Sequence, residues 1–232
     1  MEDWETSYMK RLAEIASFRG GSVLELGYGM GISAGFIESN PDVDSHCVIE
    51  CHPGVATKAL TDFRDSVDKS RFHLLSGFWQ DITPKLADGS FDAVVACLVF
   101  EHIEAVDAAI AEVARVLEPG GRFAFFLNHP LLQTPGSGWI DDQVLDPPEQ
   151  YWRIGPYLVE DSSIEEVEKD VFIPFIHRPM SRYVNAMADA GLTLRRMHEP
   201  APPPGFLARA AEYAEAASIP RLLVLVAERE GT

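Results

Sequence analysis

This sequence is short of three features that mark particular classes of protein: cysteine, long apolar runs and positive charge. Its three cysteines cannot build a disulfide framework, and no apolar run reaches the roughly 18 residues of a membrane helix. Only 19 Lys and Arg residues face 36 Asp and Glu residues, and the resulting net charge of −17 repels phosphate backbones. Residues 1–10 are polar and acidic, unlike a signal peptide. We therefore expect a cytoplasmic protein with no membrane or nucleic-acid partner.

Two cysteines and two histidines gather in one short stretch, as His46, Cys47, Cys51 and His52. Such a cluster is typical of a zinc site when the ligands can meet at one ion. If residues 47–51 form a strand, the two thiols lie about 13 Å apart, at about 3.3 Å per residue. That separation is too large for a shared ion, so we expect no metal site.

The most informative stretch is VLELGYGMG, residues 23–31, which reads as a strand, a tight glycine turn and the start of a helix. Glycines allow positive φ angles and let a ligand approach the backbone closely. The start of a helix offers free N–H groups and the positive end of a dipole. The turn therefore predicts a nucleotide-like ligand. The residues assigned to it are Glu25, Gly27, Tyr28, Gly29, Met30 and Gly31.

Two later strand ends supply further candidate ligand contacts. Glu50 ends an expected strand and lies 19 residues beyond Gly31. In doubly wound folds an acid at that point accepts hydrogen bonds from ribose hydroxyls. The expected third strand is followed by Phe78, Trp79 and Gln80. Aromatic rings and an amide side chain suit an adenine, which needs an apolar wall and a hydrogen-bond partner. Ordinary core packing is the alternative for Trp79.

The order of elements predicts a single α/β domain over residues 1–232, with seven strands in a sandwich. Residues 91–98 form a near-continuous apolar run, typical of a buried parallel strand. Residues 1–21 read as an N-terminal lid helix. Residues 131–176, rich in Pro, Gly, acids and aromatics, read as an insertion of short helices or strands over the acceptor site. Its aromatic side chains either line a pocket or form a small core of their own. The strands are expected at 22–27, 45–50, 72–76, 91–98, 122–127, 192–197 and 221–227.

Four segments in order resemble guanidinoacetate and arginine N-methyltransferases: residues 1–9, 23–31, 48–55 and 76–94. The glycine pattern G-x-G-x-G, with an acid two residues before it, also resembles motif I of class I S-adenosylmethionine (SAM) methyltransferases. It differs from the dinucleotide fingerprint G-x-G-x-x-G. The resemblance implies a Rossmann-like seven-stranded fold, SAM as cofactor and S-adenosylhomocysteine as product. The resemblance implies eight SAM-site residues: Met9, Met30, Gly31, Glu50, Cys51, His52, Trp79 and Gln80. We add Phe78, Cys97 and Leu98 as further candidates for this site.

The sequence differs from this family at a residue that would contact the acceptor. The family carries an aspartate after the fourth strand that holds the acceptor nitrogen, and the matching residue here is Cys97. A thiol cannot make the same ionic hydrogen bond to a guanidinium. From Leu98 onward, the segments VFEHI, LEPGG and FIHRPMSRYVNAMADAGL resemble ubiquinone-biosynthesis-type methyltransferases. The expected acceptor is therefore a small molecule, methylated on nitrogen or oxygen.

Four side chains are candidates to hold the acceptor or to act as a base: Glu5, His102, His129 and His177. In the resembling family, the residue at Glu5 binds the acceptor guanidinium. Each candidate also has a structural interpretation. Glu5 could be a solvated helix acid and His102 part of a structural Glu-His pair. His129 could cap a turn, and His177 could contact a backbone carbonyl. Methyl transfer needs a base only if the acceptor is protonated. Two other functions stay open, an NAD-dependent oxidoreductase and a non-catalytic SAM-binding protein, and we expect a monomer or homodimer.

Overall fold

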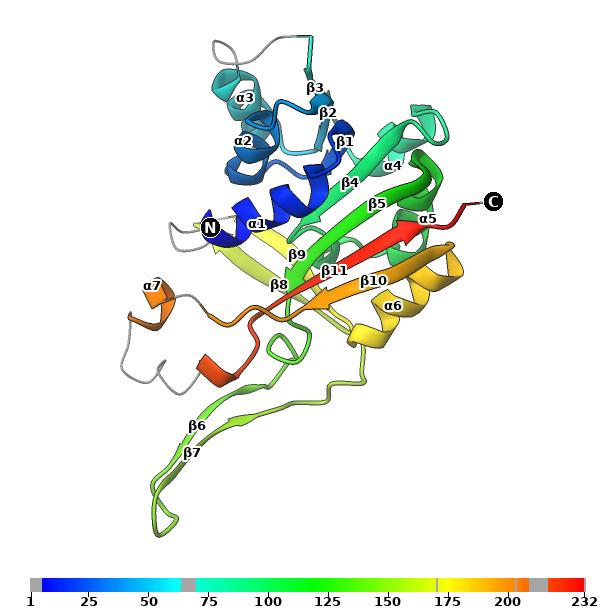
Figure 1. The fold of residues 1–232 in the computed structure, drawn as a ribbon. Helices are drawn as coiled ribbons and strands as arrows, with labels where there is room; N and C mark the ends of the chain where they lie inside the picture. The colour runs from blue at the N-terminus through cyan, green and yellow to red at the C-terminus, as the bar shows by residue number, and fades with distance from the viewer. Residues whose placement is uncertain (1–5, 64–69, 170, 203, 209–216, 232) are drawn as a thin grey trace.

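A seven-stranded sheet forms the centre of the protein in the computed structural model, which describes residues 6–63, 70–169, 171–202, 204–208 and 217–231. The strand order is β10-β11-β5-β4-β1-β2-β3 (Figure 1). The predicted seven-stranded α/β fold is confirmed. The strands are β1 Gly21–Leu26, β2 Val43–Glu50, β3 Phe72–Ser76, β4 Phe91–Cys97, β5 Leu117–Asn128, β10 Leu192–His198 and β11 Leu222–Arg229.

One strand of this sheet, β11, runs opposite to the other six. Strand β1 pairs in parallel with β2 and with β4, and the β2–β3 and β4–β5 pairs are also parallel. Strand β11 lies between β5 and β10 and is antiparallel to both. The carboxyl ends of β1, β2, β4 and β5 therefore meet at one edge of the sheet, where ligands bind in open α/β folds.

Helices cover both faces of the sheet (Figure 1). Alternate strand residues point to opposite faces: Val23 and Val95 pack with Leu12 of one layer, whereas Leu24 and Val94 pack with Ile110 of the other. The first layer holds α1 Thr6–Ser17, α2 Ile32–Glu38 and α3 Pro53–Asp62. The second holds α4 Trp79–Ile82, α5 Val106–Val116 and α6 Met180–Asp189. The structure also has the short helices η2 Thr83–Lys85, η3 Phe100–His102 and α7 Pro204–Leu207.

The expected lid helix is packed firmly onto the sheet. Met9, Leu12 and Ala13 of α1 are buried against the face that carries Val95 and Phe126. The apolar face of α1 therefore covers β4 and β5. Residues 1–5, which include the candidate Glu5, lie outside the described part of the chain.

Several expected boundaries differ from the structure. The fifth strand, expected over residues 122–127, runs from Leu117 to Asn128. The helical spacing of Val106, Ile110, Val113 and Leu117 predicts a helix through Leu117, but α5 ends at Val116 because Leu117 pairs with Phe91 in β4. The sequence also predicts a helix over residues 206–217; the structure describes α7 there, and residues 209–216 lie outside the described part.

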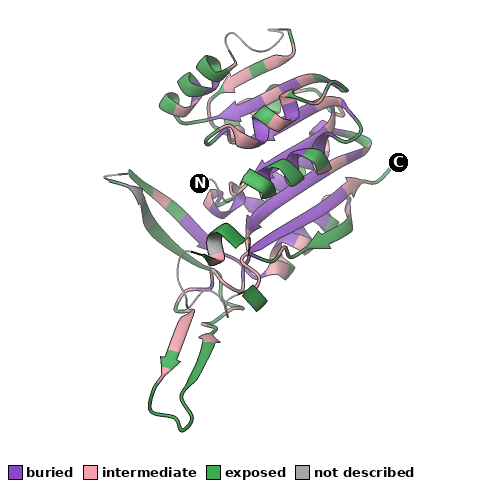
Figure 2. Cartoon of the chain, turned by 60° about the vertical axis from the view of Figure 1, so that its left-hand side comes forward, coloured by how far each residue is buried: buried purple, intermediate pink, exposed green. Residues whose placement is uncertain are grey.

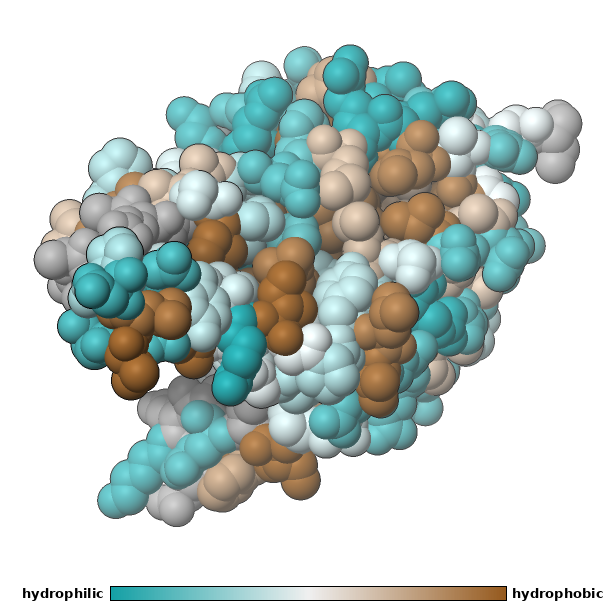
Figure 3. Space-filling view, turned by 90° about the horizontal axis from the view of Figure 1, so that it is seen from below, coloured by the Kyte–Doolittle hydropathy of each residue, from teal (hydrophilic) through white to brown (hydrophobic). Residues whose placement is uncertain are grey.

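The predicted insertion consists of two β-hairpins. Strand β6 Gly138–Asp142 pairs with β7 Glu149–Arg153, and β8 Asp161–Glu168 pairs with β9 Val171–His177. The β6–β7 hairpin projects from the body and is mostly exposed, whereas the end of β9 is buried (Figures 1 and 2). Seen from below, the surface shows apolar patches separated by polar residues (Figure 3).

The described residues contain no helix that is both long and apolar enough to cross a membrane. In the same part of the chain, no three His, Cys, Asp or Glu side chains are grouped so that they could hold a metal ion.

We expect that the β6–β7 hairpin can be removed without loss of the fold. Residues 138–153 lie outside the three buried core clusters, and the hairpin's base is already closed by a hydrogen bond from Gly155 N to Ser137 Oγ at 2.9 Å. Replacing residues 138–153 with two glycines should change the free energy of unfolding by about 0.5–1 kcal/mol at most, as surface changes do. Urea denaturation measures this. A loss of several kcal/mol would show that the hairpin supports the core.

Candidate functional site

The glycine turn between β1 and α2 adopts a backbone that only glycine accommodates easily. Gly27, Gly29 and Gly31 all have positive φ angles, of 78°, 53° and 79°. A Cβ at Gly31 would collide with the hydroxyl of Tyr28, and one at Gly27 would lie 2.7 Å from Val99 Cγ2. The turn is therefore held close to its surroundings, and its backbone is available to a ligand.

The side chain of Tyr28 is buried, and its hydroxyl packs against Gly31 of the turn. Its hydroxyl donates a hydrogen bond to Asp62 Oδ2 at 2.6 Å, and its ring meets Phe63 edge-on. Burial and the hydrogen bond to Asp62 raise the pKa of Tyr28. The predicted ligand contact at this position is thus limited to main-chain atoms.

Glu50 lies at the carboxyl end of β2, beside the glycine turn, and is almost fully buried. One carboxylate oxygen accepts the N–H of Tyr28 at 2.9 Å, and the other accepts the N–H of His52 at 2.7 Å. Each oxygen keeps a further lone pair for a hydroxyl donor. The carboxylate is thus held in place beside the turn, as a ribose diol requires.

The side chains of Cys51 and His52 are exposed next to Glu50. Burial and the charge of Glu50 raise the pKa of the Cys51 thiol. His52 caps α3, because its Nδ1 accepts the N–H of Val55 at 3.3 Å. Both residues border the predicted ribose position.

The side chains predicted to contact the adenine lie in two different environments. Trp79 is half-buried against the main core and lines a small apolar cavity with Leu24 and Val113 on the α5 face of the sheet. This placement favours core packing as the role of its ring. Phe78 is 61% exposed and Met30 is 50% exposed, and Gln80 is also exposed. Phe78 and Met30 offer the apolar surface that the wall needs.

Strained backbone follows the tip of β4. Leu98 has a φ of 53°, a left-handed conformation that costs a branched side chain about 1 kcal/mol or more. Its N–H donates to the carbonyl of Phe126 in β5 at 2.9 Å. The preceding Cys97 directs its Sγ to within 3.1 Å of Met9 Sδ in α1. The predicted residues Met9, Cys97 and Leu98 therefore lie together where β4 meets α1.

Two of the candidate histidines form hydrogen bonds with backbone carbonyls, His102 with one in β9 and His177 with one that precedes β8. His102 Nδ1 lies 2.7 Å from the carbonyl oxygen of Pro174, and His177 Nε2 lies 2.9 Å from that of Tyr157. A carbonyl only accepts, so each of these ring nitrogens carries a proton and donates. The structural interpretation of His177 as a carbonyl contact matches this geometry. His102 makes the same kind of contact, although a Glu-His pair was its expected structural role.

His129, at the tip of β5, has both ring nitrogens engaged and is almost fully buried. Its Nδ1 accepts the N–H of Leu131 at 3.2 Å, so the proton sits on Nε2, which lies 2.9 Å from Glu199 Oε1. The ring therefore caps the turn after β5, as its structural interpretation expected. Beside it, the hydroxyl of Tyr8 in α1 donates to the carbonyl of Ala201. These contacts hold residues 199–201 against the tip of β5 and α1.

Glu101 is a buried acid at this edge that the sequence analysis did not single out. Its Oε1 accepts the backbone N–H of Asn128 at 2.8 Å, and its Oε2 is buried without a hydrogen-bond partner. Burial raises the pKa of Glu101. The sequence carried one signal, an acid set among apolar residues in VFEHI.

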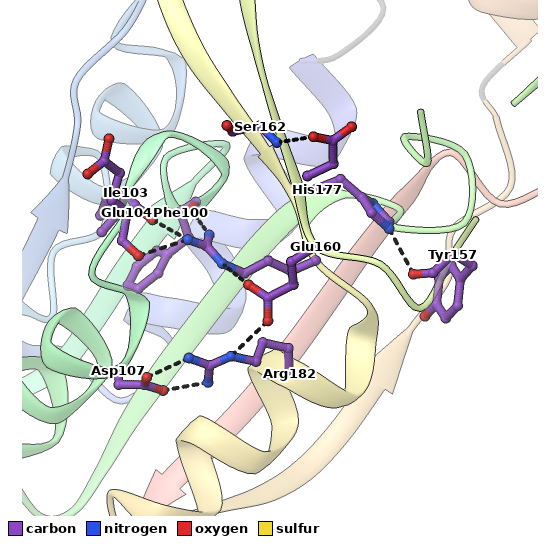
Figure 4. Close-up of polar contacts among 11 residues, drawn as sticks. Phe100, Ile103, Glu104, Asp107, Tyr157, Glu160, Ser162, His177 and Arg182 are labelled. Atoms are coloured by element: carbon purple, nitrogen blue, oxygen red, sulfur yellow. Dashed lines mark hydrogen bonds and ion pairs between the residues drawn. The ribbon is translucent and has the colours of Figure 1, made fainter. Parts of the chain in front are cut away.

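Arg178 was also not singled out, and it holds the loop that follows β4. Its guanidinium donates to the carbonyls of Ile103 at 2.8 Å and Glu104 at 2.9 Å. Glu160 approaches it at 3.5 Å and also accepts a hydrogen bond from Arg182, at 3.1 Å (Figure 4). The arginine thus joins η3 to the start of α6.

Comparison with known proteins identifies the family. Residues 1–125, more than half of the chain, match the model of the guanidinoacetate N-methyltransferase family. The chain belongs to this family. Protein arginine N-methyltransferase 2 of Candida glabrata is 37% identical over 134 residues, which cover 54% of this chain and 32% of the relative. The chain therefore spans about a third of the length of that curated relative.

Solved structures share the fold of this family member over nearly its whole length. An S-adenosylmethionine-dependent methyltransferase from Mesorhizobium loti matches with a TM-score of 0.75 and 23% identity, covering 94% of this chain and 96% of that one. A second, from Listeria monocytogenes, matches with a TM-score of 0.73 and 19% identity over 98% and 99% of the two chains. Family and fold are those of a class I SAM-dependent methyltransferase. The likeness after Leu98 to ubiquinone-biosynthesis-type enzymes stays a prediction.

The residues at this edge fit SAM, the cofactor of the family. The glycine turn leaves its backbone open to a ligand, and a Cβ at Gly31 would be blocked. Glu50 presents free lone pairs beside the turn, and the exposed apolar side chains of Met30 and Phe78 provide surface for an adenine. Apart from Met9 in α1 and Glu25 within β1, the predicted cofactor residues lie at or just beyond the carboxyl ends of β1, β2, β3 and β4.

We expect two glycines four residues apart to respond oppositely to alanine. Gly31→Ala should destabilise the fold by about 1–2 kcal/mol because of its left-handed backbone and should weaken SAM binding. Gly35→Ala should be neutral or stabilising by up to about 1 kcal/mol, since Gly35 lies within α2 with nothing within 4 Å of its Cβ position. Urea denaturation and SAM titration calorimetry measure both effects. Equal losses from the two changes would contradict this account of the turn.

Two neighbouring arginines should also differ in their contribution to stability. Arg178→Met removes a buried cation from three carbonyls and should cost about 2–4 kcal/mol. Arg182→Met removes a more exposed ion pair with Asp107 and should cost about 0–1 kcal/mol. Chemical denaturation of both variants tests this, with the Arg182 variant as the control. Similar costs would show that the carbonyl contacts of Arg178 add little.

Proposed function

We propose that this chain transfers the methyl group of SAM to a small-molecule acceptor, on nitrogen or oxygen. The observation that carries the proposal is the set of cross-connections around the tips of β4 and β5. Tyr8 joins α1 to residue 201, His129 is joined to Glu199, and Arg178 joins η3 to the start of α6. Such connections support an enclosed acceptor position, which suits a small molecule better than a folded protein.

The cofactor side of the proposal assigns binding to groups already held in place. The backbone of the glycine turn and the Glu50 carboxylate would hold SAM, with Met30 and Phe78 against its adenine. When bound, SAM supplies an electrophilic methyl group, so the difficult chemistry belongs to the cofactor. The protein's task is to orient the acceptor lone pair, which can be worth about 7–11 kcal/mol.

We further propose that orientation of the acceptor carries the transfer and that His129 is not its base. Both ring nitrogens of His129 are engaged, whereas His102 and His177 each donate one N–H to a carbonyl and keep the other ring nitrogen as an acceptor. To accept a proton from an acceptor, His129 would have to release the N–H of Leu131. A neutral amine needs no such base. Glu5 stays the candidate to contact the acceptor on the strength of the family resemblance alone.

A protein acceptor is the second candidate, because the relative from Candida glabrata is named a protein arginine N-methyltransferase. Two observations argue against assigning protein arginine methylation to this chain. The match covers about a third of that relative, and Cys97 stands where the family aspartate holds the acceptor nitrogen. The glycine spacing and the family membership leave no support for an NAD-dependent oxidoreductase.

The deciding experiment follows isotopically labelled methyl groups from SAM by mass spectrometry. One sample contains guanidinoacetate, a second a small-metabolite extract, and a third an arginine-rich protein. We expect label on a small molecule in the first or second sample, and greatly reduced label with the Gly31→Ala variant. Label on the protein alone would favour the second candidate. Tight SAM binding with no label in any sample would favour a non-catalytic SAM-binding protein.

A further inference from the structure

A histidine lies between two carboxylates directly behind the glycine turn. His46 is fully buried, and its Nε2 lies 3.1 Å from Glu25 Oε2 while its Nδ1 lies 2.9 Å from Glu38 Oε1. The two carboxylate side chains are only 1% and 3% exposed. The hydroxyl of Ser33 donates to the other oxygen of Glu25. The group forms a continuous buried network of four side chains.

This network spans the elements that carry the turn. Glu25 is in β1, two residues before Gly27, and Ser33 is in α2, two residues after Gly31. Their hydrogen bond therefore joins the two ends of the turn. Glu38 is the last residue of α2 and His46 lies in β2. The histidine thus fixes both ends of α2 with respect to the sheet.

The two contacts of His46 require one proton more than a neutral imidazole brings. An ionised carboxylate only accepts, and a neutral ring has a single N–H. Burial lowers the pKa of His46, but hydrogen bonds to Glu25 and Glu38 and their charges outweigh it, so the pKa is raised. From the β3 side, the imidazole faces the uncharged ring of Phe72 at 5.7 Å, and the backbone N–H of His46 donates to the carbonyl of Arg71.

Loss of that proton would leave two carboxylates buried close together. Glu38 Oε2 is already buried without a hydrogen-bond partner, so its charge depends on the imidazole for compensation. Removing one partner of a buried ion pair is strongly unfavourable. The network is consequently stable only while the extra proton is present.

We propose that His46 is a positioning residue of the cofactor site, which clamps α2 to β1 and β2 so that residues 27–31 keep their SAM-binding shape. The proposal rests on the proposed function in that SAM is the ligand. A raised folded-state pKa means that the stabilisation is complete below the unfolded pKa of about 6.5 and is lost as the pH rises through the folded pKa. SAM affinity should follow the same direction.

The test measures the Kd for SAM by calorimetry, and thermal unfolding, from about pH 6 upward. The wild type should bind SAM more weakly as the pH rises. His46→Gln should bind roughly tenfold to a hundredfold more weakly, the range seen when outer-shell partners of metal ligands are lost, and without the pH dependence. Asp44→Asn, an exposed acid on the same strand, should behave like the wild type.

A second variant keeps the test decisive if His46→Gln does not fold. In Glu38→Gln, the amide can donate to a neutral imidazole, so the extra proton is no longer required. This variant should bind SAM more tightly than His46→Gln and lose the pH dependence. A folded His46→Gln with wild-type Kd, or a Glu38→Gln that keeps the pH dependence, would overturn the clamp. A wild type that binds no SAM at any pH would overturn the proposed function and this inference with it.

Discussion

The parallel pairing of β1 with β2 and with β4 is the constraint on which the site depends. It brings the carboxyl ends of these strands to one edge, so that the Gly27–Gly31 turn, Glu50 and Cys97 lie close together. None of these residues is near the others in sequence. The pairing is maintained by apolar side chains on both faces, since Val23 and Leu24 point into different cores.

Buried polar groups then determine the shape of that edge. Glu50 accepts the backbone N–H of Tyr28 in the turn and that of His52. Glu101 accepts the N–H of Asn128, and Arg178 donates to carbonyls after η3. Backbone groups at strand tips have left the ladder and need partners when buried. Charged side chains supply stronger hydrogen bonds there than neutral ones would. The same groups that satisfy the backbone therefore position the atoms available to a ligand.

Much of the fold was predictable because its signals are local. The apolar run of residues 91–98, the alternation of strands with helices and the glycine turn each depend on a few neighbouring residues. The end of α5 was missed by one residue, since pairing with a distant strand extends β5 to Leu117. The insertion was expected to hold helices or strands, and its two hairpins depend on cross-strand pairing that spacing alone does not reveal.

The sequence by itself determined the seven-stranded fold, the position of the glycine turn and the acid at the end of β2, because periodicity and glycine placement act locally. Only the tertiary structure decided what the polar side chains do. It joined His129 to Glu199, set Trp79 against the core and enclosed His46 between Glu25 and Glu38. The physical reason is that a hydrogen bond or a buried charge depends on a partner far away in the chain, and folding alone selects that partner.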